Sequence, residues 1–161
     1  MILIRAAVIA IAAAIIATAG CSSGPSPTFS LSNASVDQGY TCPAGATNAR
    51  YDVHGTIHAQ NSTSKAVTIA GIDATMTLAA VKGGWLQKIG DRYDAGNATF
   101  TPDSVRAGAS TTINVTFSSA CTGRVASGPV ASADYKVTFT LSTSAGRFKI
   151  DSKDRHQIIT G

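Results

Sequence analysis

The feature that most constrains this chain is the strict alternation of apolar and polar residues in RYDVHGTIHAQN, residues 50–61. Every second position from Tyr51 to Ala59 carries an apolar residue or a glycine, and polar residues stand between them. Successive side chains of a β-strand point to opposite faces of a sheet. A period of two therefore predicts a strand with one face in a core and the other in water.

The same kind of segment recurs along the chain between turn-forming stretches. Residues 29–36 predict a first short strand, and residues 65–81 predict either two strands or one long strand bent at Gly71. Residues 147–151 predict a strand that pairs back in a hairpin, and residues 154–161 a short last strand or a tail. Two further strands are expected to face the core through Ile113, Val115, Phe117, Tyr135, Val137, Phe139 and Leu141.

The composition agrees with an all-β domain. Only 14% of the residues are charged, there is no Glu, and Ser, Thr, Ala, Gly and Val dominate. Residues that favour helices are scarce and β-branched residues are abundant. Short strands separated by turns about every ten residues are typical of a β-sandwich. We therefore expect an immunoglobulin-like antiparallel β-sandwich of about seven to nine strands, formed by residues 29–161.

Two segments resemble known protein domains. FTPDSVRAGASTTINVTF, residues 100–117, resembles the strand–turn–strand unit of bacterial immunoglobulin-like domains, in which a glycine marks the turn. YDVHGTIHAQNST, residues 51–63, is similar to a strand of small immunoglobulin-like lipoprotein domains. The resemblance implies the sandwich fold and membership of the bacterial lipoproteins, and it implies no catalytic residues.

The N-terminal segment has the features of an export signal. Arg5 precedes a run, residues 6–20, that is apolar apart from Thr18. As a helix this run would span about 22 Å, whereas a bilayer core is roughly 30 Å thick. A positive start, a short apolar stretch and small residues at its end are typical of a secretory signal peptide, which we assign to residues 1–20.

Two cleavage sites compete after this run. Thr18-Ala19-Gly20-Cys21 resembles the lipobox of bacterial lipoproteins, in which the cysteine is fatty-acylated and becomes the first residue. The alternative is cleavage after Ala19, which leaves a free thiol at Cys21. The chain has three cysteines, and lipidation of Cys21 leaves an even pair. We expect a lipid anchor on the extracytoplasmic side of the cell envelope, with residues 21–28 as a flexible tether.

The remaining cysteines, Cys42 and Cys121, predict a structural disulfide. An exported protein folds in an oxidising compartment. The bond would close a loop of roughly 80 residues and stabilise the fold by about 4–5 kcal/mol in the chain-entropy model. A redox pair or a metal site is the alternative, but the chain has no C-x-x-C motif and no histidine adjacent to either cysteine.

The charge pattern does not favour nucleic acid as a partner. The formal net charge is +4, from 13 Lys and Arg against 9 acidic residues. Nucleic-acid-binding proteins usually concentrate basic residues with aromatic residues on one face, whereas the basic residues here are scattered. A mildly basic, solvated surface is the simpler interpretation.

The strongest constellation of titratable residues is on the polar face of residues 50–61. His54 and His58 share this face with Asp52. Four residues along a strand span about 13 Å, so a single metal ion cannot bind both histidines directly. A metal-handling or enzymatic role for this face is one alternative, and two exposed histidines are the other. We find no nucleophile–base motif and no cofactor motif, and expect no catalysis.

Three aromatic residues in or near predicted loops are the candidates for binding. They are Trp85, Tyr93 and Tyr40. Aromatic residues in loops can stack on ligands or anchor a protein partner, and they can equally pack across the edge of a sandwich. We expect a membrane-anchored binding or structural module whose ligand is a protein or a small molecule.

Overall fold

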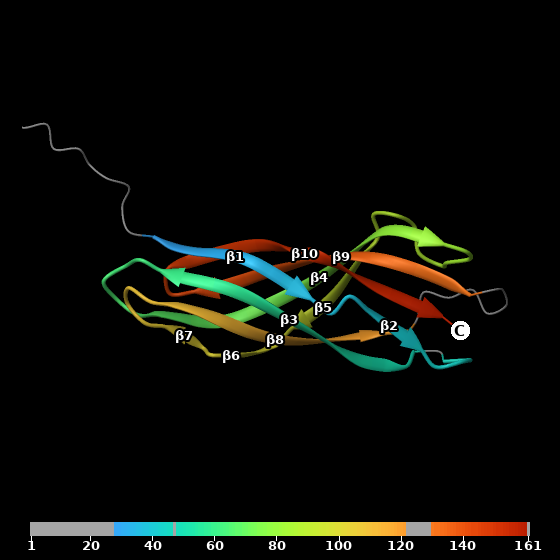
Figure 1. Cartoon of the computed structure of the whole chain (residues 1–161), viewed down its shortest axis with the longest axis horizontal. Helices are drawn as coiled ribbons and strands as arrows, with labels where there is room; N and C mark the ends of the chain where they lie inside the picture. The colour runs from blue at the N-terminus through green and yellow to red at the C-terminus, as the bar shows by residue number, and fades with distance from the viewer. Residues whose placement is uncertain (1–27, 47, 122–129, 161) are drawn as a thin grey trace, which may run out of the picture.

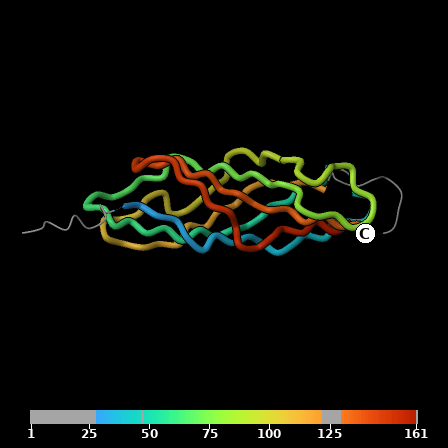
Figure 2. The backbone as a smooth tube through the Cα atoms, turned by 90° about the horizontal axis from the view of Figure 1, so that it is seen from above, coloured from blue at the N-terminus to red at the C-terminus, as the bar shows by residue number. Residues whose placement is uncertain are grey.

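The computed structural model describes residues 28–46, 48–121 and 130–160, which form ten strands in two sheets. One sheet has the order β1-β3-β8-β6, and the other has the order β2-β10-β9-β4-β5, with β7 paired to the start of β4. The two sheets stack face to face (Figures 1 and 2), so the expected all-β sandwich is confirmed. The strands are β1 (Phe29–Val36), β2 (Gly39–Cys42), β3 (Arg50–Asn61), β4 (Val67–Lys82), β5 (Arg92–Asn97), β6 (Thr99–Thr101), β7 (Ser104–Val105), β8 (Ser110–Ala120), β9 (Ala131–Thr143) and β10 (Gly146–Thr160).

The core follows the alternation in the sequence. In β3 the even-numbered residues from Asp52 to His58 are exposed or half-buried, whereas Val53 and Ile57 are fully buried. Phe117 of β8 packs edge-on against Phe139 of β9, with ring centroids 5.9 Å apart, and so joins the two sheets. All the residues that the sequence predicts to face the core are buried: Ile113, Val115, Phe117, Tyr135, Val137, Phe139 and Leu141.

Two strands are long: β4 confirms the alternative of one long strand through Gly71, and β10 joins two elements that the sequence predicts to be separate. Strand β4 is continuous through Gly71, and bulges lie between Ile69 and Gly71 and between Leu78 and Ala80. The predicted hairpin is confirmed, because residues 147–151 pair back with the end of β9. Strand β10 then continues as one strand of 15 residues with an irregularity between Asp151 and Arg155, so the prediction of a separate short strand or tail is wrong. A bulge shifts the alternation of side chains without ending the strand, and the sequence pattern therefore looks like a break.

Two further details differ from the expectation of seven to nine antiparallel strands. The short strands β2, β6 and β7 raise the count to ten, because β2 and β7 form inside stretches with the composition of turns. Strand β2 pairs parallel to β10, with Gly39 opposite Gln157 and Cys42 opposite Thr160. Only Asp37 and Gln38 separate β1 from β2, so the chain crosses from one sheet to the other without reversing its direction.

The sandwich is elongated, and its two ends are distinct (Figures 1 and 2). We call the end that holds Phe29 and the β3–β4 turn the N-terminal end. The opposite end, which we call the far end, holds the β4–β5 connection and the start of β9. Strand β4 runs from one end toward the other over 16 residues, or about 50 Å at roughly 3.3 Å per residue. No helix suited to crossing a bilayer occurs in the described part of the chain.

Candidate functional site

The three aromatic residues predicted to bind a ligand all lie toward the far end of the sandwich. Tyr40 is on β2, Tyr93 is on β5 and Trp85 is in the β4–β5 connection, and each is half-buried against the core. Tyr93 and Tyr135 line a cavity of about 10 Å³. This volume holds about one water molecule, so the cavity does not accommodate a small-molecule ligand.

Trp85 holds the β4–β5 connection against β9. Its Nε1–H donates a hydrogen bond to Oη of Tyr135 at 3.2 Å, and the Tyr135 hydroxyl donates to the side-chain oxygen of Gln87. Burial raises the pKa of Tyr135, so this hydroxyl stays protonated and remains a donor. Trp85 therefore attaches the β4–β5 connection to β9.

Backbone contacts fold the same connection into a compact hairpin. The N–H of Leu78 donates to the carbonyl of Asp91 at 2.9 Å, and the N–H of Gly90 donates back to the carbonyl of Leu78 at 2.8 Å. The N–H of Lys88 donates to the Asp91 carboxylate at 2.8 Å. These bonds fix the position of the loop relative to the end of β4.

The folded connection exposes large aliphatic side chains. Leu86 and Ile89 are 64% and 65% exposed, and Val130, which directly precedes β9, is 66% exposed. Val81, near the end of β4, is 41% exposed. We call these four residues the aliphatic tip. They are the only large hydrophobic residues classed as exposed in the described part of the chain, and all four lie at the far end.

The sequence analysis missed the aliphatic tip. It identified Trp85 but not its neighbour Leu86 or the nearby Ile89. The sequence does contain a sign of the tip. A connection rich in glycine and lysine normally carries polar residues at its apex, so Leu86 and Ile89 depart from the usual pattern of polar loops and apolar core. Val130 carries no comparable signal, since it follows a predicted loop and directly precedes a strand.

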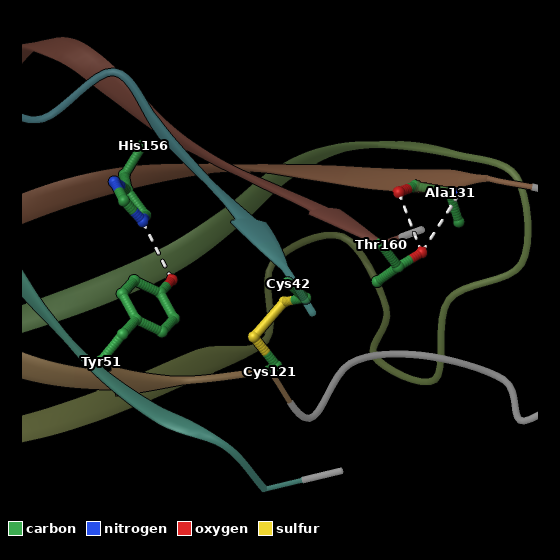
Figure 3. Close-up of a disulfide and its surroundings, with 6 residues drawn as sticks. All are labelled: Cys42, Tyr51, Cys121, Ala131, His156 and Thr160. Carbon is green, nitrogen blue, oxygen red and sulfur yellow. Dashed lines mark hydrogen bonds between the residues drawn. A yellow bond between two sulfur atoms is a disulfide. The ribbon is translucent and has the colours of Figure 1, made fainter. Parts of the chain in front are cut away.

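A buried polar pair lies between the two sheets near the far end (Figure 3). The Tyr51 hydroxyl on β3 and Nε2 of His156 on β10 are 2.9 Å apart, and Nδ1 of His156 is 2.8 Å from the carbonyl oxygen of Asp37. Tyr40 stacks on Tyr51 with ring centroids 3.8 Å apart. Burial raises the pKa of Tyr51 to about 12 and lowers the pKa of His156. A neutral imidazole that donates through Nδ1 and accepts through Nε2 satisfies all these groups.

The predicted disulfide between Cys42 and Cys121 is confirmed (Figure 3). The two Cα atoms are 5.9 Å apart, and both cysteines are buried. Cys42 ends β2 of one sheet and Cys121 directly follows β8 of the other. The bond therefore joins the two sheets at the far end.

The polar face of β3 points away from the core, as its alternation predicts, with His54 exposed and His58 half-buried. Nδ1 of His54 is 3.0 Å from Oδ2 of Asp37, in the connection between β1 and β2. Asp52 accepts a hydrogen bond from Ser118 of β8 at 3.4 Å, and His58 lies opposite Thr112 in the register. Each predicted residue thus has a different neighbour, and the described residues contain no group of three His, Cys, Asp or Glu side chains arranged to hold a metal ion.

A shallow groove follows the same face where β1 departs from β3. Its volume is about 420 Å³, and it is bordered by His54, Asp37 and the hydroxyls of Ser35 and Thr56, which share a hydrogen bond of 2.7 Å. No aromatic or cationic side chain other than His54 lines it. Cys21 and the rest of the expected signal peptide and tether up to residue 27 lie outside the described residues.

The comparisons with known proteins give only weak structural similarity. No family model and no curated protein matches this sequence. The PapD-like domain 7 of human CEP192 is similar in structure, with 13% identity, coverage of 94% of each chain and a TM-score of 0.33. A protein assigned as late embryogenesis abundant has 17% identity over 83% of this chain and 71% of its own, with a TM-score of 0.44. AggA, the major subunit of aggregative adherence fimbriae type I of Escherichia coli, has 7% identity over 83% of this chain and 95% of its own, with a TM-score of 0.35. At these values the similarities carry no conclusion about this chain.

Proposed function

We propose that this chain is a lipid-anchored, extracytoplasmic binding module that presents the aliphatic tip to a protein partner, without catalysing a reaction. The observation that carries the proposal is the position of the tip. The four exposed aliphatic residues belong to the end of β4, the β4–β5 connection and the segment just before β9. These segments lie at the end of the sandwich opposite the start of β1 (Figures 1 and 2).

Exposed aliphatic residues concentrated at one end of a molecule favour contact with another molecule. Single exposed hydrophobic residues are normal on a protein surface, but a group of them usually marks an interaction site. Leu86 and Ile89 are separated by only two residues, and Gly83 packs against the backbone of Ala131, next to Val130. The tip therefore draws together the end of β4, the β4–β5 connection and the start of β9.

The support beneath the tip favours binding over accidental exposure. The connection is held by Trp85 and by the hydrogen bonds between Leu78 and the Gly90–Asp91 segment. A loop that is fixed before binding loses little conformational entropy when a partner docks on it. Lys82 and Lys88 flank the tip, so a partner with an apolar centre and an acidic rim would match it.

The expected lipid anchor would orient the aliphatic tip relative to the membrane. Cys21 precedes Phe29 by a short Ser- and Pro-containing segment, so a lipid at Cys21 would hold the N-terminal end of the sandwich near the membrane. The aliphatic tip would then face away from the membrane, where partners of an envelope protein are accessible. Both the anchor and the cellular location are part of the proposal.

Site-specific photo-cross-linking tests the binding role. A photoreactive residue replaces Leu86 or Ile89 in the full chain in its native membrane fraction, and the same residue replaces Lys65 at the N-terminal end as the matched control. We expect a discrete cross-linked protein from positions 86 and 89 and none from position 65. Identical products from all three positions would contradict the role of the tip.

A separate arm tests the anchor. We expect Cys21→Ala to move the chain from the membrane fraction to the soluble fraction and to abolish labelling by a fatty-acid analogue. Unlabelled wild-type protein would remove the anchor from the proposal and leave the result at the tip standing.

A further inference from the structure

The outer face of the second sheet carries a basic groove. The groove has a volume of about 470 Å³, within the range of ligand-binding sites. It runs over β5, β4, β9 and β10, and no large apolar residue lines it. Its lining residues are Thr77, Arg92, Lys136, Thr138, Lys149 and Asp151.

The strand register brings the cations of this groove together from three strands. Arg92 lies opposite Thr77, and Thr77 lies opposite Lys136, so the two cations stand in one cross-strand row about 10 Å apart at roughly 4.8 Å per strand. Lys149 lies opposite Thr140 on the neighbouring strand pair. The three cations thus surround the hydroxyl groups at the centre of the groove.

The positive charge of the groove is only partly neutralised. Asp151 accepts from Lys136 at 2.5 Å and from the Thr138 hydroxyl at 2.6 Å, and these hydrogen bonds hold the pKa of its carboxyl below the usual range. Arg92 and Lys149 have no carboxylate partner among the described residues. Among the lining residues, three cations stand against one carboxylate.

A further cation lies next to this group. Arg155 lies directly opposite Lys136 in the register of β9 and β10, so two positive side chains are neighbours on the same face. Like charges in this position destabilise a sheet, and an anion between them would relieve the repulsion. The row from Arg92 through Lys136 to Arg155 thus holds three cations. Lys136 is paired with Asp151, and Asp94 and Asp134 on the same face offset part of the remaining charge.

We propose that this groove binds a ligand that carries two linked phosphate groups. Guanidinium and ammonium groups bind phosphate oxygens through charge-assisted hydrogen bonds, and threonine hydroxyls supply further donors. A single phosphate reaches only part of a row about 10 Å long, whereas two linked phosphates contact Arg92 and Lys136 together. None of its lining residues belongs to the aliphatic tip, so the site extends the proposed function without depending on it.

Calorimetric titration of the full chain in a neutral detergent tests this site. The probes are pyrophosphate, inorganic phosphate and glycerol 3-phosphate, which represents the phosphate of a lipid headgroup. We expect saturable binding of pyrophosphate at one site and binding roughly tenfold weaker for the two single phosphates. The absence of saturable binding by pyrophosphate overturns the proposal. Equal affinity for glycerol 3-phosphate overturns the requirement for two phosphates and assigns the groove to a headgroup.

Charge variants test the location of the site, and they should change the affinity for pyrophosphate in opposite directions. Arg92→Gln and Lys149→Gln break no ion pair of the described residues, and each should weaken pyrophosphate binding by roughly fivefold. Asp151→Asn removes the only carboxylate of the groove and should strengthen binding by a similar factor. Lys65→Gln changes the net charge equally at the N-terminal end and should leave the affinity unchanged. An equal loss in Lys65→Gln, or weaker binding in a folded Asp151→Asn variant, overturns the proposal.

Discussion

At the scale of single residues, the pair formed by Tyr51 and His156 makes the core sensitive to acid. His156 is 1% exposed, and both of its ring nitrogens have partners. Protonation of Nε2 would remove the acceptor of the Tyr51 hydroxyl and would place a charge in the core. Because burial lowers the pKa of His156 from its usual 6.5, the folded protein keeps this imidazole neutral.

The sign of the resulting pH dependence follows from proton binding. Between the usual histidine pKa and the lowered pKa of the folded state, the unfolded chain binds a proton that the folded chain does not. The contribution of His156 to stability is therefore complete above pH 6.5 and decreases as the pH falls toward its lowered pKa. We expect the melting temperature, followed by circular dichroism, to fall between pH 7.5 and about pH 5.5.

Two variants separate this effect from general acid destabilisation. In His156→Gln the protein should be less stable at neutral pH, and its melting temperature should depend less on pH over the same interval. His54→Gln removes an exposed imidazole and should leave the fall in place. A wild-type melting temperature that stays constant over this interval would contradict the role of His156.

The exposure or burial of the three histidines was not equally predictable from the sequence. His54 and His58 belong to an alternating segment, so their exposure could be predicted from the pattern. His156 lies in DRHQIITG. The irregularity between Asp151 and Arg155 shifts the alternation of β10, so that the side chain of His156 faces the core. Nothing in the sequence indicates this irregularity. The partners of these histidines come from other strands, and the spacing of residues within one segment does not reveal them.

At the scale of elements, Gly55 shows why one position of β3 lacks a side chain. A methyl group at this position would stand 2.8 Å from the carbonyl oxygen of Ser35 and 3.1 Å from the ring of Phe139. The glycine therefore allows β1 and the largest buried side chain of β9 to approach β3 closely.

Gly55→Ala should lower the free energy of unfolding by about 1–3 kcal/mol, because backbone and ring must shift to admit the methyl group. Gly71→Ala in β4 is the matched control, since no heavy atom lies within 4 Å of the added group. The control should be neutral or slightly stabilising. Denaturant titration of both variants provides the measurement, and an equal loss in the two would contradict the steric explanation.

The elements themselves were predictable where alternation is regular. Residues 50–61 and 110–120 form β3 and β8, close to the segments that the sequence indicates. The short strands β2 and β7 were not predictable, because their composition is that of turns and only pairing with distant residues makes them strands. Pairing depends on the tertiary fold, so local composition does not encode it.

At the scale of the whole molecule, the disulfide is the covalent connection between the two sheets. The bond spans 79 residues and closes the far end of the sandwich. In the chain-entropy model a loop of this length stabilises the folded state by about 4–5 kcal/mol. The β1–β2 connection depends on the same bond, because Cys42 follows it closely.

Removal of the disulfide should therefore lower the melting temperature markedly. For Cys42→Ala combined with Cys121→Ala we expect a decrease of roughly 10–20 °C in thermal unfolding. The β-rich circular-dichroism spectrum should persist below the transition, since the core residues of β3, β8 and β9 are unchanged. A decrease of only one or two degrees would contradict a stabilising role for the bond.

The direction of β1 has a mechanical consequence. If the protein is held at Phe29 and pulled at the opposite end by a bound partner, the load runs parallel to the strands. The backbone hydrogen bonds that pair β1 with β3 then bear the force in shear, all together, instead of opening one after another. The covalent link between residues 42 and 121 prevents the chain between them from extending. A molecule built in this way resists being drawn out along its own length.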